Sequence, residues 1–215
     1  MTAVPLGADA SPAAHSGAVR KGTGGKRRVQ HHQVFSGYQV PEARLRSQPL
    51  PRPSGKLEML SVNDSSAHVS VNIYNQDGSY NDDALDELNH FWRCRRTGTE
   101  KAIEPHLFEI LSLVYDHFGK PLELVSGFRN QKRTTSFHFI GSASDIRITG
   151  VSERALKEFV EELDTGGMGI GIYPHGHFIH VDVRPEPSYR WVDYSSPGSG
   201  ELGHPKNQRK RSPNT

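Results

Sequence analysis

Regular apolar periodicity is confined to residues 56–195, so any folded domain is expected within that part of the chain. Residues 1–37 are rich in Gly, Ala, Ser, His and Arg and show no sustained apolar period, which predicts disorder. Residues 38–55 hold four prolines, a composition typical of an extended linker. Residues 196–215 are again polar and basic, and we expect a disordered tail there. The sequence thus predicts a single domain between two unfolded ends.

Charge is distributed unevenly along the chain. Residues 1–55 hold eight Lys/Arg and two Asp/Glu, residues 196–215 hold four and one, and residues 56–195 hold fourteen and twenty-one. The domain is therefore acidic and its two ends are basic. Basic ends can bind polyanions such as nucleic acid or acidic wall polymers, or they can simply be solvated. We expect solvated ends and no specific nucleic-acid partner, because basic and aromatic residues are not interleaved as in a base-stacking surface.

Several classes of protein are excluded at this level. No stretch approaches the roughly 18 consecutive apolar residues of a membrane span. Cys94 is the one cysteine, which excludes an intrachain disulfide framework and a cysteine-rich zinc module. The first twenty residues lack the basic start and apolar run of a signal peptide. The predicted domain is long enough to bury a core without disulfides, and we expect it to be a monomer.

Strand-like and helix-like segments are segregated along the domain, which predicts an α+β fold. Apolar stripes at helical spacing predict three helices, over residues 82–95, 105–118 and 153–163. Strand-like segments cover residues 57–62, 68–74, 122–128, 144–148, 169–173 and 178–184. The first two of these strands flank a turn-rich Asn-Asp-Ser-Ser sequence and are expected to form a hairpin.

Three polar residues can converge at the ends of this pattern. His138 and Asp145 are seven residues apart, and Gly141 permits the chain to turn between them. Alternation places Asp145 on the face of its strand opposite the core, and places His180 on the corresponding face of a later strand. Two imidazoles and one carboxylate leave the fourth position of a tetrahedral zinc ion open, as in catalytic sites. Spacing alone, however, favours the interpretation that each of these side chains is a satisfied surface or core group.

The sequence motifs around these residues favour a metal site over satisfied surface or core groups. The pattern Ser-x-His-x-x-Gly-x-Ala-x-Asp over residues 136–145 follows Ser-Gly-Phe-Arg at 126–129. It precedes Gly-Ile-Tyr-Pro at 171–174 and Phe-Ile-His-Val-Asp at 178–182. The combination resembles the peptidase M15 family, and most closely its branch of small murein endopeptidases.

The resemblance implies a fold, an activity and a set of site residues. The fold is that of the hedgehog and D-Ala-D-Ala-peptidase proteins, with an antiparallel sheet and helices packed on one side. A zinc ion would be held by His138, Asp145 and His180. Arg129 would bind a substrate carboxylate or carbonyl and, as a catalytic residue, would help the zinc to stabilise the charge that develops on the carbonyl oxygen. Ser136 would either hydrogen-bond beside the metal or fix its loop. The substrates would be peptidoglycan peptides, which implies a periplasmic or cell-envelope location.

The general base is where the sequence departs from the family pattern. Other branches carry Glu or Asp three residues before the last zinc histidine, and His177 occupies that position here. Imidazole can act as a base near neutral pH, so His177 is the predicted base. Strict alternation nevertheless places His177 opposite His180, unless it lies in the turn before the strand. His175 and Asp182 are the alternatives.

Aromatic residues gather in the last third of the domain, at Tyr173, Tyr189, Trp191 and Tyr194. They could line a groove for substrate, but packing is the interpretation that we favour.

These observations predict a zinc-dependent peptidase that hydrolyses peptide bonds in peptidoglycan through a metal-activated water. The alternative is a peptidoglycan-binding module that retains zinc without hydrolysis, which the unusual His177 would explain. A polyanion binder acting through the basic ends ranks last.

Overall fold

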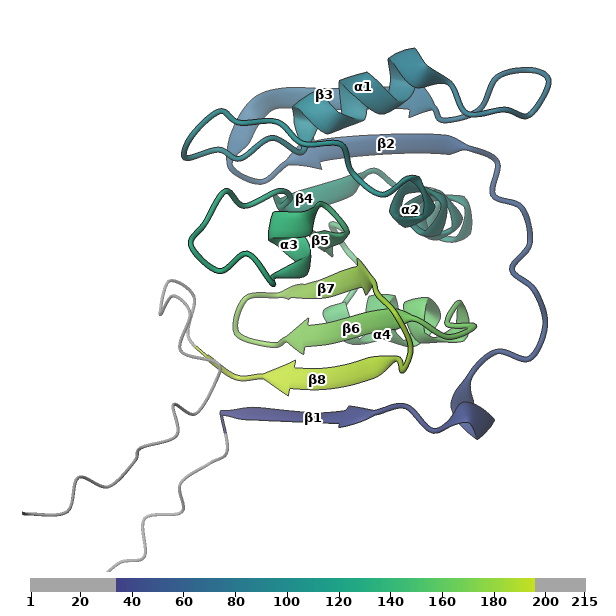
Figure 1. Ribbon diagram of the computed structural model, residues 1–215, viewed down its shortest axis with the longest axis vertical. Helices are drawn as coiled ribbons and strands as arrows, with labels where there is room; N and C mark the ends of the chain where they lie inside the picture. The colour runs from purple at the N-terminus through teal and green to yellow at the C-terminus, as the bar shows by residue number, and fades with distance from the viewer. Residues whose placement is uncertain (1–33, 196–215) are drawn as a thin grey trace, which may run out of the picture. The chain divides into compact units, whose positions relative to one another are not determined.

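The computed structural model describes residues 34–195 (Figure 1). Its strands are β1 (Phe35–Gln39), β2 (Lys56–Ser61), β3 (Asp64–Asn72), β4 (Leu122–Ser126), β5 (Ala143–Arg147), β6 (Met168–Tyr173), β7 (Phe178–Val183) and β8 (Tyr189–Asp193). Its helices are the 3-10 helix η1 (Glu42–Arg44) and the α-helices α1 (Asp82–Phe91), α2 (Pro105–Phe118), α3 (Phe137–Ile140) and α4 (Glu153–Glu162). The predicted α+β class is confirmed.

One sheet contains all eight of these strands in the order β1-β8-β6-β7-β5-β4-β2-β3. The sheet is mixed, because β2 pairs parallel with β4 and β6 pairs parallel with β8, while the other pairs are antiparallel. The expectation of an antiparallel sheet is therefore wrong for two pairs. Parallel neighbours need a long connection, and α1 and α2 supply it between β2 and β4. The expected hairpin of β2 and β3 is confirmed.

The three predicted helices form where their end signals lie. The side chain of Asn81 accepts a hydrogen bond from the Ala84 amide and starts α1, and Ser152 does the same for α4 through Ala155. Helix α2 begins at Pro105 and ends before Gly119, which has φ +59°. Helix α1 ends at Phe91, four residues before the predicted end.

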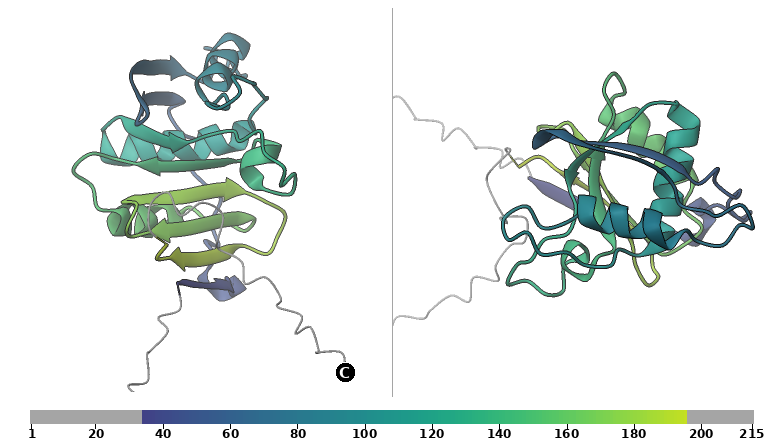
Figure 2. Two further views of the ribbon diagram at one scale, coloured as in Figure 1. Left: turned by 90° about the vertical axis from the view of Figure 1, so that its left-hand side faces the viewer. Right: turned by 90° about the horizontal axis from the view of Figure 1, so that it is seen from above.

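The two faces of the central strands have different roles. Ile146 of β5 and Ile179 and Val181 of β7 are fully buried in the core, against which α2 and α4 pack. Asp145 and His180 alternate with these residues and therefore lie on the other face. Helix α3 lies on that other face, as the left view of Figure 2 shows. Helices thus cover both faces of the sheet, which corrects the expectation that they pack on one side.

Two elements precede Lys56, where sequence analysis expects structure to begin. Strand β1 pairs antiparallel with the edge strand β8, and η1 follows it. Residues 1–33 and 196–215, which carry most of the predicted disordered ends, lie outside the described residues. The division of the chain into four segments remains a prediction. Within residues 34–195, no helix has the length and apolar character needed to cross a membrane.

Candidate metal centre

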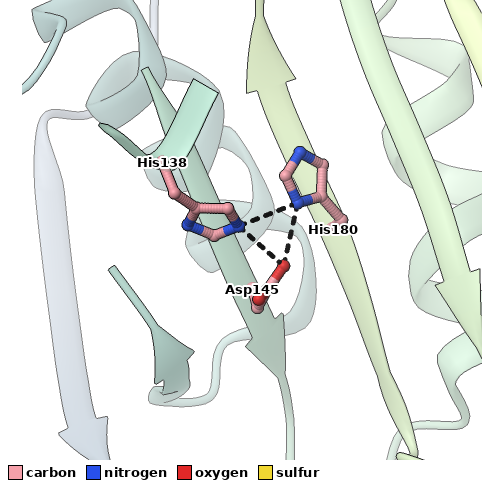
Figure 3. Close-up of side chains that lie close together, drawn as sticks. All are labelled: His138, Asp145 and His180. Atoms are coloured by element: carbon pink, nitrogen blue, oxygen red, sulfur yellow. Dashed lines mark hydrogen bonds and ion pairs between the residues drawn. The ribbon is translucent and has the colours of Figure 1, made fainter. Parts of the chain in front are cut away.

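Three side chains from three elements meet on the face of the sheet opposite the core (Figure 3). His138 comes from α3, Asp145 from β5 and His180 from β7, and all three are buried. His138 Nε2 lies 3.1 Å from His180 Nδ1 and 3.3 Å from Asp145 Oδ1. His180 Nδ1 lies 2.9 Å from the same carboxylate oxygen. The structure therefore brings together the three residues that the spacing argument selected.

Local backbone structure explains why these residues meet. The antiparallel register of β5 and β7 places Asp145 directly opposite His180. Gly141 ends α3 in the left-handed region, with φ +86°, and this turn leads the chain from His138 into β5. A Cβ atom at Gly141 would lie 2.7 Å from the carbonyl oxygen of Ala102, so the turn has no room for a side chain.

Hydrogen bonds on the far side of each imidazole fix which nitrogen faces the centre. His138 Nδ1 donates to the backbone carbonyl of Gly127 at 2.7 Å, which leaves Nε2 with its lone pair towards Asp145. His180 Nε2 donates to Asp182 Oδ2 at 2.8 Å, which leaves Nδ1 facing the centre once the ring is neutral. Both rings are thus oriented as metal ligands are, with the second nitrogen held by a carbonyl or a carboxylate.

The donor set fits a divalent metal ion. Three lone-pair-bearing atoms separated by 2.9–3.3 Å repel one another unless a proton or a cation lies between them. Ligands about 2.0–2.1 Å from a tetrahedral ion lie roughly 3.3 Å from one another, close to the separations observed here. Imidazole nitrogen together with carboxylate oxygen suits zinc and neighbouring transition metals.

Protonation of the metal-free cluster is set by burial and by its neighbours. Burial lowers the pKa of His180, but hydrogen bonds to Asp145 and Asp182 outweigh this and raise that pKa to about 9. Burial also lowers the pKa of His138. Burial alone would raise the pKa of the Asp145 carboxyl. Electrostatic attraction to His138 and Arg129 outweighs burial and holds this pKa well below its usual value. At neutral pH and without metal, His180 therefore carries a second ring proton, on the Nδ1 atom that faces Asp145.

Arg129 reaches the same centre. Its Nη2 donates to Asp145 Oδ2, and its Nε donates to Ser126 Oγ at 2.7 Å. Its side chain is still 42% exposed, so part of the guanidinium is open to a ligand. A planar fork in this position can bind a carboxylate or a carbonyl oxygen, which is the role that the family resemblance implies.

Behind His180 lie two charged residues, Arg184 and Asp182, the second of which sequence analysis names as an alternative base. Asp182 is fully buried and accepts hydrogen bonds from Arg184 Nε at 2.6 Å and from His180. The Arg184 guanidinium also lies 4.5 Å from the ring centre of Phe137, next to His138 in α3. Arg184 thus contacts both Asp182, which supports His180, and the helix that carries His138. The sequence signal was the shared face of residues 180, 182 and 184 in one alternating strand.

Two aromatic side chains, Trp191 and Tyr173, lie beside His180. The indole of Trp191 lies with its ring centre 5.0 Å from that of His180, and its Nε1 donates to the Tyr173 hydroxyl at 3.1 Å. A Cβ atom at Gly171 would overlap the indole, so the glycine is what admits Trp191. Tyr173 and Trp191 therefore border the centre, whereas Tyr194 is half exposed.

The remaining predicted site residues lie outside this cluster. His177 occupies the turn before β7 with φ +52°; its side chain is 76% exposed, and its Nδ1 lies 3.8 Å from Glu153 of α4. Since α4 covers the core face, His177 points away from His180. His175 is exposed, with its ring 6.1 Å from that of Tyr194. Ser136 lies just before α3 and makes no side-chain cap hydrogen bond.

Comparison with known proteins gives the family. The family model described as peptidoglycan L,D-endopeptidase MepK (Peptidase_M15_2) matches residues 54–189. The chain belongs to this family. It is 31% identical over 150 residues to peptidoglycan L,D-endopeptidase MepK of Escherichia coli (strain K12), covering 63% of this chain and 79% of that relative.

A second relative is more distant. The probable peptidoglycan L,D-endopeptidase MepK of Haemophilus influenzae (strain ATCC 51907 / DSM 11121 / KW20 / Rd) is 29% identical over 123 residues, which cover 50% of this chain and 65% of the relative. No solved structure matches the chain significantly. The M15 assignment is thus confirmed, and the expected likeness to the hedgehog and D-Ala-D-Ala-peptidase fold remains a prediction.

Proposed function

We propose that this chain is a metal-dependent peptidoglycan L,D-endopeptidase. The observation that carries the proposal is the buried cluster of His138, Asp145 and His180 in a member of the MepK family. The relatives are named for cleaving peptidoglycan, and the cluster supplies the ligand set that a metallopeptidase needs. Because peptidoglycan is the proposed substrate, the proposed location is the cell envelope.

Zinc is the metal that this donor set fits best. Bound there, it would lower the pKa of a water molecule and polarise the carbonyl of the peptide bond. The chain's own residues hold the metal and orient the substrate. His138 and His180 present one nitrogen each, and Asp182 keeps His180 in the required tautomer. Arg129 orients the substrate through its exposed donors.

The identity of the base that accepts the water proton remains a prediction. His177 was selected from its place in the sequence, and its exposed position beside Glu153 does not bring it to the cluster. A His177→Ala variant tests whether His177 is the base. If the base is His177, activity falls by about 10²–10⁴-fold, whereas a residue outside the site leaves activity nearly unchanged.

The test of the function is digestion of isolated muropeptides by the purified full chain, followed by mass spectrometry of the products. Metal-loaded protein should release new peptides, and both chelation and His138→Ala should abolish their release. Absence of new products from metal-loaded protein would contradict the enzyme proposal. Tight muropeptide binding without turnover would instead identify the non-catalytic binding module.

A further inference from the structure

Strand β6 presents an unusual face to the metal centre. Gly169, Gly171 and Tyr173 alternate along it and pair with Asp182, His180 and Phe178 of β7. These six positions share the face that carries the cluster. With glycine at the first two positions, Tyr173 is the side chain that β6 contributes to this face.

The phenol of Tyr173 is held on two sides. Its ring stacks on that of Phe178, with centres 4.5 Å apart and planes at 14°. Its oxygen accepts the Trp191 Nε1 proton at 3.1 Å, and Trp191 is itself packed against His180. Both contacts fix the hydroxyl before any ligand arrives, so forming a further hydrogen bond costs little rotational freedom.

The hydroxyl proton of Tyr173 is free to be donated in a hydrogen bond to a ligand. A phenol can accept and donate at once, and Trp191 uses the accepting side. Within residues 34–195, no group accepts the Tyr173 proton, although the side chain is half-buried. Burial and the charge of Asp145 raise the pKa of Tyr173 to about 12, so the hydroxyl keeps its proton at neutral pH.

We propose that Tyr173 is a catalytic residue whose O–H donates a hydrogen bond to the carbonyl oxygen of the peptide bond being cleaved. This inference rests on the proposed function. Attack on a peptide carbonyl moves negative charge onto its oxygen, and a fixed donor in a partly buried site stabilises that charge more than water does. Loss of one such donor costs about 10²–10³-fold in kcat in comparable sites.

The decisive variant is Tyr173→Phe, which keeps the ring stack and removes one oxygen atom. Its kcat on muropeptides should fall by about 100-fold or more, while KM changes by less than about threefold. Metal content and melting temperature are measured on the same preparations, and both should match the wild type. The matched control is Tyr189→Phe, which removes a hydroxyl that lies against Gly37 of the edge strand β1. This control should keep the wild-type kcat.

The outcomes are separable. An active wild type with an unchanged kcat in Tyr173→Phe would overturn the inference and leave the proposed function intact. A rise in KM alone would also overturn it, because the hydroxyl would then bind the ground state and the transition state equally. An inactive metal-loaded wild type would overturn the proposed function, and this inference with it.

Discussion

At the scale of single residues, the centre depends on which nitrogen of each imidazole carries a proton. Asp182 decides this for His180, because its carboxylate accepts from Nε2 and leaves Nδ1 for the metal. Arg184 holds the carboxylate in place through Nε and Nη2. The pKa of Asp182 is lowered because these hydrogen bonds outweigh the effect of burial.

Replacing Asp182 by Asn should weaken metal binding by about 10- to 100-fold, since an amide is a poorer acceptor and leaves Arg184 unpaired. The measurement is metal retention against increasing concentrations of a chelator. Asp86→Asn, on the exposed face of α1, is the control and should behave as the wild type. Equal retention in both variants would show that Asp182 does not support the ligand.

Metal binding should release about one proton at pH 7. The pKa of His180 is raised to about 9 without metal, so its ring is protonated at pH 7 and must lose a proton to become a ligand. Apparent affinity should therefore rise by up to about tenfold per pH unit between pH 7 and 8 and level off above pH 9. Calorimetric titration in two buffers of different ionisation enthalpy measures the proton, and no buffer dependence would contradict the assignment.

The same shift has a consequence for folding of the metal-free protein. The folded pKa of His180 lies above the unfolded value of 6.5. Its contribution to stability is therefore fully present below pH 6.5 and is lost as the pH rises through 9.

At the scale of elements, the sequence predicted best where apolar spacing is long and regular. Helix α2 was placed to the residue, because Pro105 and Gly119 mark its ends. Helix α3 was missed, since a single turn of four residues cannot show a helical period. Strand β8 was missed because its buried Arg190 breaks the apolar alternation. Arg190 pairs with Asp164 and Glu161.

Strand β6 makes room for the Trp191 indole because Gly171 has no side chain. Gly171→Ala should destabilise the fold by about 1–3 kcal/mol, because the new methyl group would overlap the Trp191 indole. Urea unfolding measures the loss. Pairing the change with Trp191→Leu removes the overlap, so the double variant should cost less than the sum of the two single variants. Strict additivity would show that the indole does not fill this space.

At the scale of the whole molecule, the site is assembled from segments far apart in the chain. His138 and His180 are separated by 42 residues, and the pairing of β5 with β7 closes this distance. Alternation predicted the faces that Asp145 and His180 occupy, but the order of strands in the sheet is set by tertiary packing and could not be derived from it. The same limit applies to His177, whose direction depends on a left-handed turn that the sequence does not mark with glycine.

The central claim is that His138, Asp145 and His180 hold one divalent metal ion. The most direct measurement is metal content per chain, by elemental mass spectrometry after loading and dialysis. The wild type and the control variant His68→Ala, on the edge strand β3, should each retain about one ion per chain, whereas His138→Ala and His180→Ala should retain almost none. A wild type without metal, or histidine variants that keep a full equivalent, would contradict the account.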